Sequence, residues 1–362
     1  MRIIDRYIIK QFLPPLIYCI TTFVMLYVML DLFGHLDEIL RQNVKFAVIM
    51  KYYIMFIPTI FVRTMPIAAL ISTVYVLSNM HRHNEITALR ASGLSMWQIL
   101  RPFIICGFLV SLIVFLVNDR YVPGASMESE RIKSEEIEKG IKGKHRAIDD
   151  LAVYGSHNRL FYVKRFDVAN DELQNIVILE DNPNQRLVAK VVAEKAKWKD
   201  GKWLFYNCVI YRLSRTGAVI GEPLFYEEKA IDIKESPSDF ARYNSQADFM
   251  NYRELNEYID KLSRGSGKAA AKLRVDLHYK VSFPFISFVI ILIAIPFALK
   301  TRVRGATMIG MGMSIIIGFV YYAVMAISMA LGKGGVLPPF ISAWLSNIIF
   351  GVCGLVLIGR LK

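Results

Sequence analysis

Residues 84–93 form a short segment that combines charged and apolar side chains and suits docking to another protein. It contains two charged residues, two apolar residues and a closing glycine: Glu85, Arg90, Ile86, Leu89 and Gly93. The apolar pair is three residues apart, which places both side chains on one side of a helix. Glycine is typical just past a helix end. Because a helix this short is marginal in water, we expect it to need a packing partner.

A single cation, Arg63, stands in a long apolar run between Pro58 and Pro66. A cation near mid-membrane costs about 2.5–3.5 kcal/mol on insertion scales, so such residues usually face a cavity or a partner. Arg63 either presents its charge to a phosphate or carboxylate of a lipid, or it pairs with Asp31 or reaches the outer membrane surface. The residues alone favour neither alternative.

The sequence contains no recognisable catalytic or metal motif. Residues 265–268 (GSGK) resemble part of a phosphate-binding loop, but Leu262 stands where the first glycine belongs and Ala269 follows the lysine. HExxH, GxSxG and clustered His or Cys ligands are also absent from the sequence. We therefore expect no enzyme activity and no metal or other cofactor bound by this chain.

The elements that position these residues are predicted membrane spans. The 362 residues are 54% hydrophobic with a mean hydropathy of +0.37, too apolar for an ordinary soluble enzyme. Six apolar runs are long enough to cross about 30 Å of hydrocarbon, at about 12–33, 53–78, 98–118, 282–299, 306–331 and 337–358. The predicted domains are three spans in 1–118, a polar insert in 119–275 and three spans in 276–362.

The charge distribution argues against nucleic-acid binding. Residues 119–280 hold 28 Lys and Arg against 26 Asp and Glu, a net charge of +2 out of the total of +13. The excess therefore lies in the spans and their short loops, where it fits the positive-inside rule. Eleven basic residues flank the spans on the side of the termini and of residues 79–101, against four on the other side. We expect that first side to be cytoplasmic and the insert to be periplasmic.

The insert reads as an all-β domain with helical flanks. Runs rich in β-branched and aromatic residues, separated by turn signals, predict six strands, at 151–154, 159–166, 173–179, 186–197, 203–213 and 224–233. We expect a sandwich or jelly-roll-like sheet. Residues 126–139 and 252–262 are predicted helices.

The fifth span carries small residues every four positions on one face: Ala306, Gly310, Ser314 and Gly318. Such a stripe lets two helices approach closely. Static packing and a sliding interface are both compatible with it.

An ordered set of motifs resembles one family. The motifs are residues 4–8 (IDRYI), 58–70 (P-x7-P-x-AAL), 85–93 (EITALRASG), 198–203 (WKDGKW) and 276–284 (DLHYKVSFP). Together they resemble the LptF/LptG (YjgP/YjgQ) permeases of the lipopolysaccharide export system along essentially the full chain. The opening motif and Asp31-Leu32-Phe33 resemble LptG more than LptF.

The resemblance implies a transmembrane subunit that pairs with a sibling six-span permease as a heterodimer in the bacterial inner membrane. Two copies of a separate cytoplasmic ABC ATPase, which would hold ATP and Mg²⁺, would drive it. It implies that lipopolysaccharide enters a central cavity through lateral gates at the first and fifth spans, and passes to a periplasmic β-bridge protein.

The resemblance also implies roles for individual residues. It assigns ATPase coupling to Glu85, Ile86, Leu89, Arg90 and Gly93. Within this set we expect Ile86 and Leu89 to hold the ATPase and Glu85 to orient it. Some family members place a lysine near the outer end of the first span to meet the lipid phosphates. Here the candidates in that region are Asp31, Arg41, Lys45 and Arg63. Gate packing falls on Gly310, Ser314 and Gly318.

Two alternatives remain. In a mechanotransmission subunit, an ATPase would move the external domain without lipid crossing this chain. In a membrane scaffold of an envelope assembly, residues 84–93 would have no obligatory ATPase partner.

Overall fold

The computed structural model divides into two compact units. It describes residues 3–361 except 138–146, 156–158, 169, 182–186, 200, 214–218, 232, 234, 238–239, 241–248, 263–266 and 301–305. Unit 1 comprises Met1–Glu138 and Val275–Lys362, and unit 2 comprises Lys139–Arg274. Residues 119–138 thus fall in unit 1, although the sequence had grouped them with the β-domain.

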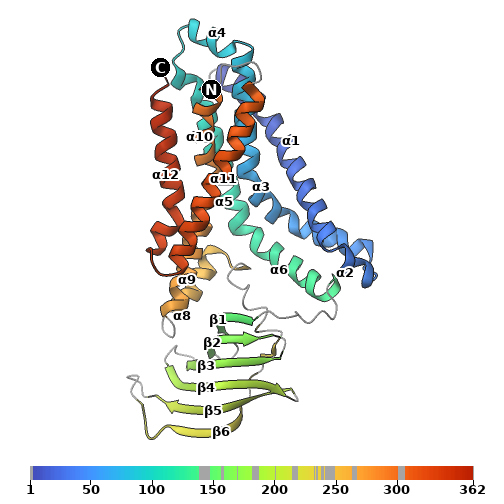
Figure 1. The fold of residues 1–362 in the computed structure, drawn as a ribbon, viewed down its shortest axis with the longest axis vertical. Coiled ribbons are helices and arrows are strands. Elements are labelled where there is room, and N and C mark those ends of the chain that lie inside the picture. Colours follow the sequence, from blue (N-terminus) through green and yellow to red (C-terminus); the bar gives the residue numbers. More distant parts are fainter. Residues whose placement is uncertain are drawn as a thin grey trace. The chain divides into compact units, whose positions relative to one another are not determined.

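Unit 1 is a helical bundle. Its helices before the insert are α1 (Ile3–Gly34), α2 (Leu36–Arg41), α3 (Phe46–Arg82), α4 (Glu85–Ala91), α5 (Met96–Arg120), α6 (Val122–Ile132) and the π-helical turn η1 (Lys133–Ile137). After it come α9 (Gly267–Ser282), which belongs to unit 1 from Val275 onward, α10 (Ile286–Lys300), α11 (Ala306–Lys333) and α12 (Pro339–Gly359). Both termini lie at the end of the bundle that carries α4 (Figure 1).

Five described helices are long and apolar enough to cross a membrane: α1, α3, α5, α11 and α12. The fourth predicted span, at 282–299, was expected to be one continuous helix and differs from that expectation. There α9 and α10 meet at a bend of 55°. The break contains Pro284, which has no N–H to donate and whose ring clashes with the carbonyl four residues earlier.

Neighbouring helices satisfy the backbone groups that the break sets free. In an unbroken helix, the N–H of residue 284 would donate to the carbonyl of Lys280. Here Asn118 Nδ2 of α5 donates to that carbonyl instead, at 3.3 Å. Asn347 Nδ2 of α12 donates to the carbonyl of Ser282 at 2.8 Å. The N–H of Phe288 donates to Ser111 Oγ at 3.0 Å. A broken helix is tolerated in a membrane only with such partners.

One continuous core joins α1, α3, α5 and α10. Ile8, Phe12 and Leu16 of α1 are buried at successive four-residue steps, and the Phe12 ring meets Phe103 of α5 edge-on at 6.0 Å. Beyond Leu16, none of the side chains of α1 is fully buried. The first half of α1 therefore holds its fully buried side chains, whereas its second half packs through partly buried ones such as Phe23, Val28 and Leu32.

Helix α6 packs on α3, which explains its place in unit 1. Thr59 Oγ1 and Ser126 Oγ are 2.9 Å apart, and Lys51 Nζ lies 3.0 Å from Glu128 Oε1. Ile132 and Ile137 are buried in a small cluster that also includes Tyr52 and Tyr53 of α3. The sequence predicted a helix at 126–139 but not what it packs against.

Unit 2 contains one antiparallel sheet and the helix α8 (Tyr252–Leu262). The strands are β1 (Ala147–Tyr154), β2 (Arg159–Asp167), β3 (Glu172–Asp181), β4 (Leu187–Lys199), β5 (Lys202–Arg212) and β6 (Leu224–Ile231), in sequential order β1 to β6. The inserted all-β domain is confirmed. The described strands form a meander, however, whereas a jelly roll needs crossing connections.

The β4–β5 hairpin is the turn that the WKDGKW motif encodes. Gly201 has φ +78°, a left-handed conformation that glycine adopts without steric cost. Trp198 and Trp203 face each other across the pair, with ring centroids 5.2 Å apart. Trp203 is fully buried, and its indole N–H donates to the carbonyl of Glu235 at 2.7 Å.

Candidate functional site

Helix α4 has sharply defined ends. Asn84 adopts a left-handed conformation (φ +59°) directly before it. At its other end, Gly93 (φ +89°) donates to the carbonyl of Arg90 at 3.0 Å, and Leu94 donates to that of Leu89 at 3.2 Å. This pair of bonds is the Schellman arrangement, which needs a left-handed residue at the position of Gly93. The predicted stop at Gly93 therefore has a clear geometric cause.

The apolar side of α4 faces its own bundle. Ile86 is only 4% exposed and belongs to the core of unit 1, and Leu89 is partly buried against that core. Ile86 is thus occupied by this chain, contrary to the expectation that the apolar pair would hold a partner. The side chains left exposed on α4 are Thr87, Ala88, Arg90 and Ala91.

Glu85 has a partner that the sequence did not suggest. The hydroxyl of Tyr7 in α1 donates to Glu85 Oε2 at 3.0 Å, and Gln11 Nε2 in turn donates to the Tyr7 oxygen. Tyr7 belongs to the IDRYI motif, but nothing local linked that motif to a residue 78 positions away.

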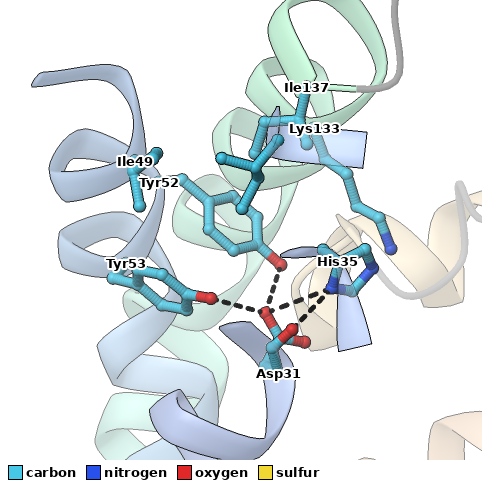
Figure 2. Close-up of a pocket in the computed structure, with 8 residues that line it drawn as sticks. Asp31, His35, Ile49, Tyr52, Tyr53, Lys133 and Ile137 are labelled. Atoms are coloured by element: carbon cyan, nitrogen blue, oxygen red, sulfur yellow. Dashed lines mark hydrogen bonds and ion pairs between the residues drawn. The ribbon is translucent and has the colours of Figure 1, made fainter. Parts of the chain in front are cut away.

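A second cluster surrounds Asp31 near the far end of α1 (Figure 2). The hydroxyls of Tyr53 and Tyr52 in α3 donate to Asp31 Oδ2 at 3.2 and 3.4 Å. His35 Nδ1 lies 2.8 Å from the Asp31 carbonyl oxygen and 3.7 Å from Oδ2. Lys133 and Ile137 of η1 line the same small cavity. The Asp31 carboxylate thus joins the end of α1 to α3, and its side chain is only 16% exposed.

The predicted cations are separate from this cluster. Arg63 is exposed, and its Nη1 donates to the hydroxyl of Tyr27 in α1 at 3.3 Å, so the alternative pairing with Asp31 is not formed. Arg41, at the end of α2, and Lys45, just before α3, are both exposed. Of these three cations, Arg63 thus contacts α1 through Tyr27, while Arg41 and Lys45 flank the connection between α2 and α3.

The small-residue face of α11 is described only at Gly318. Gly318 is buried, and a Cβ added there would lie 3.5 Å from Leu70 Cδ2 of α3. Gly310 and Ser314 belong to α11, but the surroundings of their side chains lie outside the described part of the chain. The described contact shows that α11 packs on α3 at this face.

Further along α11, a polar network that the sequence did not reveal joins it to α12. The hydroxyl of Tyr321 donates to Asn347 Oδ1 at 2.6 Å, and Ser328 Oγ donates to the Ser342 carbonyl at 2.6 Å. Because Asn347 also donates to Ser282, this network reaches the break between α9 and α10.

Comparisons with known proteins identify the family. The family model described as "Lipopolysaccharide export system permease LptF/LptG" matches residues 6–360. The comparison with curated proteins finds no match. The family match spans α1 to α12, including both units and the positions of every motif from Arg6 onward. The chain therefore belongs to the LptF/LptG family of lipopolysaccharide export system permeases.

Proposed function

We propose that this multi-pass permease is the transmembrane subunit through which a separate ABC ATPase extracts lipopolysaccharide from the inner membrane. Its partners would be an ATPase dimer at the α4 end, a sibling six-span permease and a β-bridge protein at the sheet. The α4 end would be cytoplasmic and unit 2 periplasmic. The family match covers both subunit types, so the closer likeness to LptG stays a prediction.

The observation that carries the ATPase coupling is the two-sided construction of α4. Ile86 fixes the helix to the bundle core, while Thr87, Ala88 and Arg90 are exposed. A partner that moved this exposed side would therefore also move α3 and α5, which continue directly from α4. We propose that Arg90 and the exposed side of α4 contact the ATPase, that Gly93 sets the end of the helix, and that Ile86 and Leu89 anchor it.

The lipid role is distributed among the candidate residues by their exposure. We propose that Arg41, Lys45 and Arg63 meet the acidic groups of the lipid, because their charges are exposed beside α1. Asp31 would instead hold α1 against α3, since its carboxylate accepts bonds from two tyrosines and would repel a phosphate. The contact of α11 with α3 at Gly318 would lie behind the lateral gate at the fifth span, which α11 forms.

The proposed β-bridge would extend the sheet at β6. Among the described strands, β6 pairs only with β5 and so forms one edge of the sheet, and its Phe225 is 60% exposed. An open edge of this kind can accept a strand of another chain.

A matched pair of variants tests the coupling. Ala88→Trp adds bulk to the exposed side of α4, and Ala47→Trp makes the same change at an exposed site in the first turn of α3, at the other end of that helix. Co-purification with the ATPase and ATP-dependent lipid release from proteoliposomes would be measured for both. We expect Ala88→Trp to lose both and Ala47→Trp to keep co-purification. Equal ATPase binding by the two variants and wild type would refute docking at α4.

Photocrosslinking separates this function from a mechanotransmission subunit. A photoreactive residue at position 63 should capture lipopolysaccharide during ATP turnover, whereas a subunit that only transmits motion would give no lipid adduct there. A scaffold would give neither the adduct nor ATPase co-purification.

A further inference from the structure

The start of α1 is bound to α4 by a polar contact that the proposed docking does not use. Tyr7 lies in the second turn of α1, and its hydroxyl donates to Glu85 Oε2 at 3.0 Å. Gln11, one turn later, donates to the same hydroxyl. The Tyr7 oxygen is thus used both as donor and as acceptor. A phenol that donates to a carboxylate forms a charge-assisted bond, stronger than one between neutral groups.

This contact connects α4 to a helix that is not its chain neighbour. The loops at either end of α4 join it to α3 and α5, whereas Tyr7 belongs to α1. Glu85 is the first residue of α4, so the bond holds the helix at the end where the chain arrives from α3.

Helix α1 is built to carry a displacement of its first turns. It runs without interruption for 32 residues, from Ile3 to Gly34. Its fully buried side chains, Ile8, Phe12 and Leu16, follow Tyr7 in the first half, and its second half packs through partly buried side chains such as Phe23 and Val28. A shift at Tyr7 therefore acts on the most deeply buried part of α1, and the continuous helix carries the shift to its far end, where Asp31 joins it to α3.

We propose that Tyr7 is a positioning residue that holds the Glu85 carboxylate and so ties α4 to α1. A movement of α4 is then passed to α1 directly, in addition to α3 and α5. This inference rests on the proposed function, because it takes the ATPase to be the source of that movement.

The first test uses the complete reconstituted complex and two tyrosine variants. Tyr7→Phe removes the hydroxyl but keeps the ring. Tyr18→Phe makes the same change at another exposed tyrosine of α1, 73% exposed against 44% for Tyr7. ATP hydrolysis and lipid release would be measured together. We expect Tyr7→Phe to lower the lipid released per ATP about 3-fold to 10-fold, the loss of one hydrogen bond to a charged group near the surface, while Tyr18→Phe leaves it unchanged.

A double-mutant cycle separates positioning from a general defect. Glu85→Gln keeps an oxygen that accepts from Tyr7, whereas Glu85→Ala does not. Because Glu85→Gln keeps the acceptor but loses the charge, its ratio of lipid to ATP should fall less than that of Glu85→Ala. Adding Tyr7→Phe to Glu85→Ala should cause no further loss in that ratio, because the bond is already absent. The inference would be overturned if the two substitutions lowered the ratio of lipid to ATP additively. It would also be overturned if Tyr7→Phe and Tyr18→Phe gave the same ratio.

The second test needs neither the ATPase nor lipid transport. Amide hydrogen exchange in residues 85–91 of the purified chain in nanodiscs should be about 3-fold to 10-fold faster in Tyr7→Phe than in Tyr18→Phe. Equal exchange in the two variants would show that Tyr7 does not hold α4. If the wild-type complex released no lipid with ATP, the proposed function would fail, and this measurement would still decide the role of Tyr7.

Discussion

Replacing Asn347 by leucine removes the side chain that connects three helices at the break in the fourth span. Its amide donates to the Ser282 carbonyl at 2.8 Å and accepts from the Tyr321 hydroxyl at 2.6 Å. Leucine has a similar size but can form neither bond. Asn347 is 6% exposed and Tyr321 is fully buried, so water does not replace the lost partners.

The expected cost follows from these contacts. Side-chain hydrogen bonds inside membrane proteins average about 0.6 kcal/mol, and those in soluble proteins about 1 kcal/mol. Two lost bonds therefore cost about 1–2 kcal/mol. The Tyr321 O–H loses its acceptor, and the remaining contact, in which Ser346 Oγ donates to the hydroxyl at 3.4 Å, does not replace it. This unsatisfied donor adds about 1 kcal/mol to the cost. The Ser282 carbonyl still accepts from the N–H of Phe285 at 3.2 Å, so no further penalty is added. We expect the free energy of unfolding to fall by about 2–3 kcal/mol.

Reversible unfolding of the purified chain in mixed micelles of a mild detergent and SDS measures this loss. Asn118→Leu is the matched control, because Asn118 donates one longer bond, 3.3 Å, to the Lys280 carbonyl. It should cost less than about 1 kcal/mol. Tyr321→Phe should recover part of the loss when added to Asn347→Leu. An unfolding free energy for Asn347→Leu within about 0.3 kcal/mol of wild type would refute this prediction, because a difference that small is no larger than the scatter with which such energies add.

Two further predictions concern other contacts. Gly318→Ala should leave the melting temperature unchanged or raise it, because the added Cβ would lie at an ordinary 3.5 Å from Leu70. Gly318→Leu should instead lower the free energy of unfolding by about 1–3 kcal/mol through overpacking. Equal melting temperatures for the two variants would contradict this prediction. Hydrogen bonds from Arg131 and Lys51 lower the pKa of Glu128 from 4.5 to about 2, so its contribution to the docking of α6 is present above pH 4.5 and is lost as the pH falls toward 2. The protection of the α6 amides against exchange, relative to their intrinsic rates, should fall over that range in wild type but not in Glu128→Gln, and an equal fall in both would refute it.

Local patterns were sufficient to predict most of the elements. Apolar runs placed the spans, because a membrane requires about 20 apolar residues in a row. Gly93 and Gly201 placed the end of α4 and the β4–β5 turn, because both positions have the positive φ that glycine favours. These features depend on neighbours in the sequence, so the sequence contains them directly.

The contacts that connect the elements could not be predicted in this way. Tyr7 and Glu85 are 78 positions apart, and Asp31 meets tyrosines 21 and 22 positions later. The bend at Pro284 was missed because the apolar run begins only at about residue 282, so the charged helix α9 before it did not read as part of a span. Its stability depends on distant side chains whose pairing no local pattern reveals.

The broken span has a consequence for how the chain enters the membrane. Asn118 and Ser111 belong to α5, which is made before α9 and α10, so two of the freed backbone groups find their partners at once. The third partner, Asn347, belongs to α12, the last helix of the chain. The Asn347 contact therefore forms only after α12 has inserted, and until then the Ser282 carbonyl has only its local bond from the N–H of Phe285.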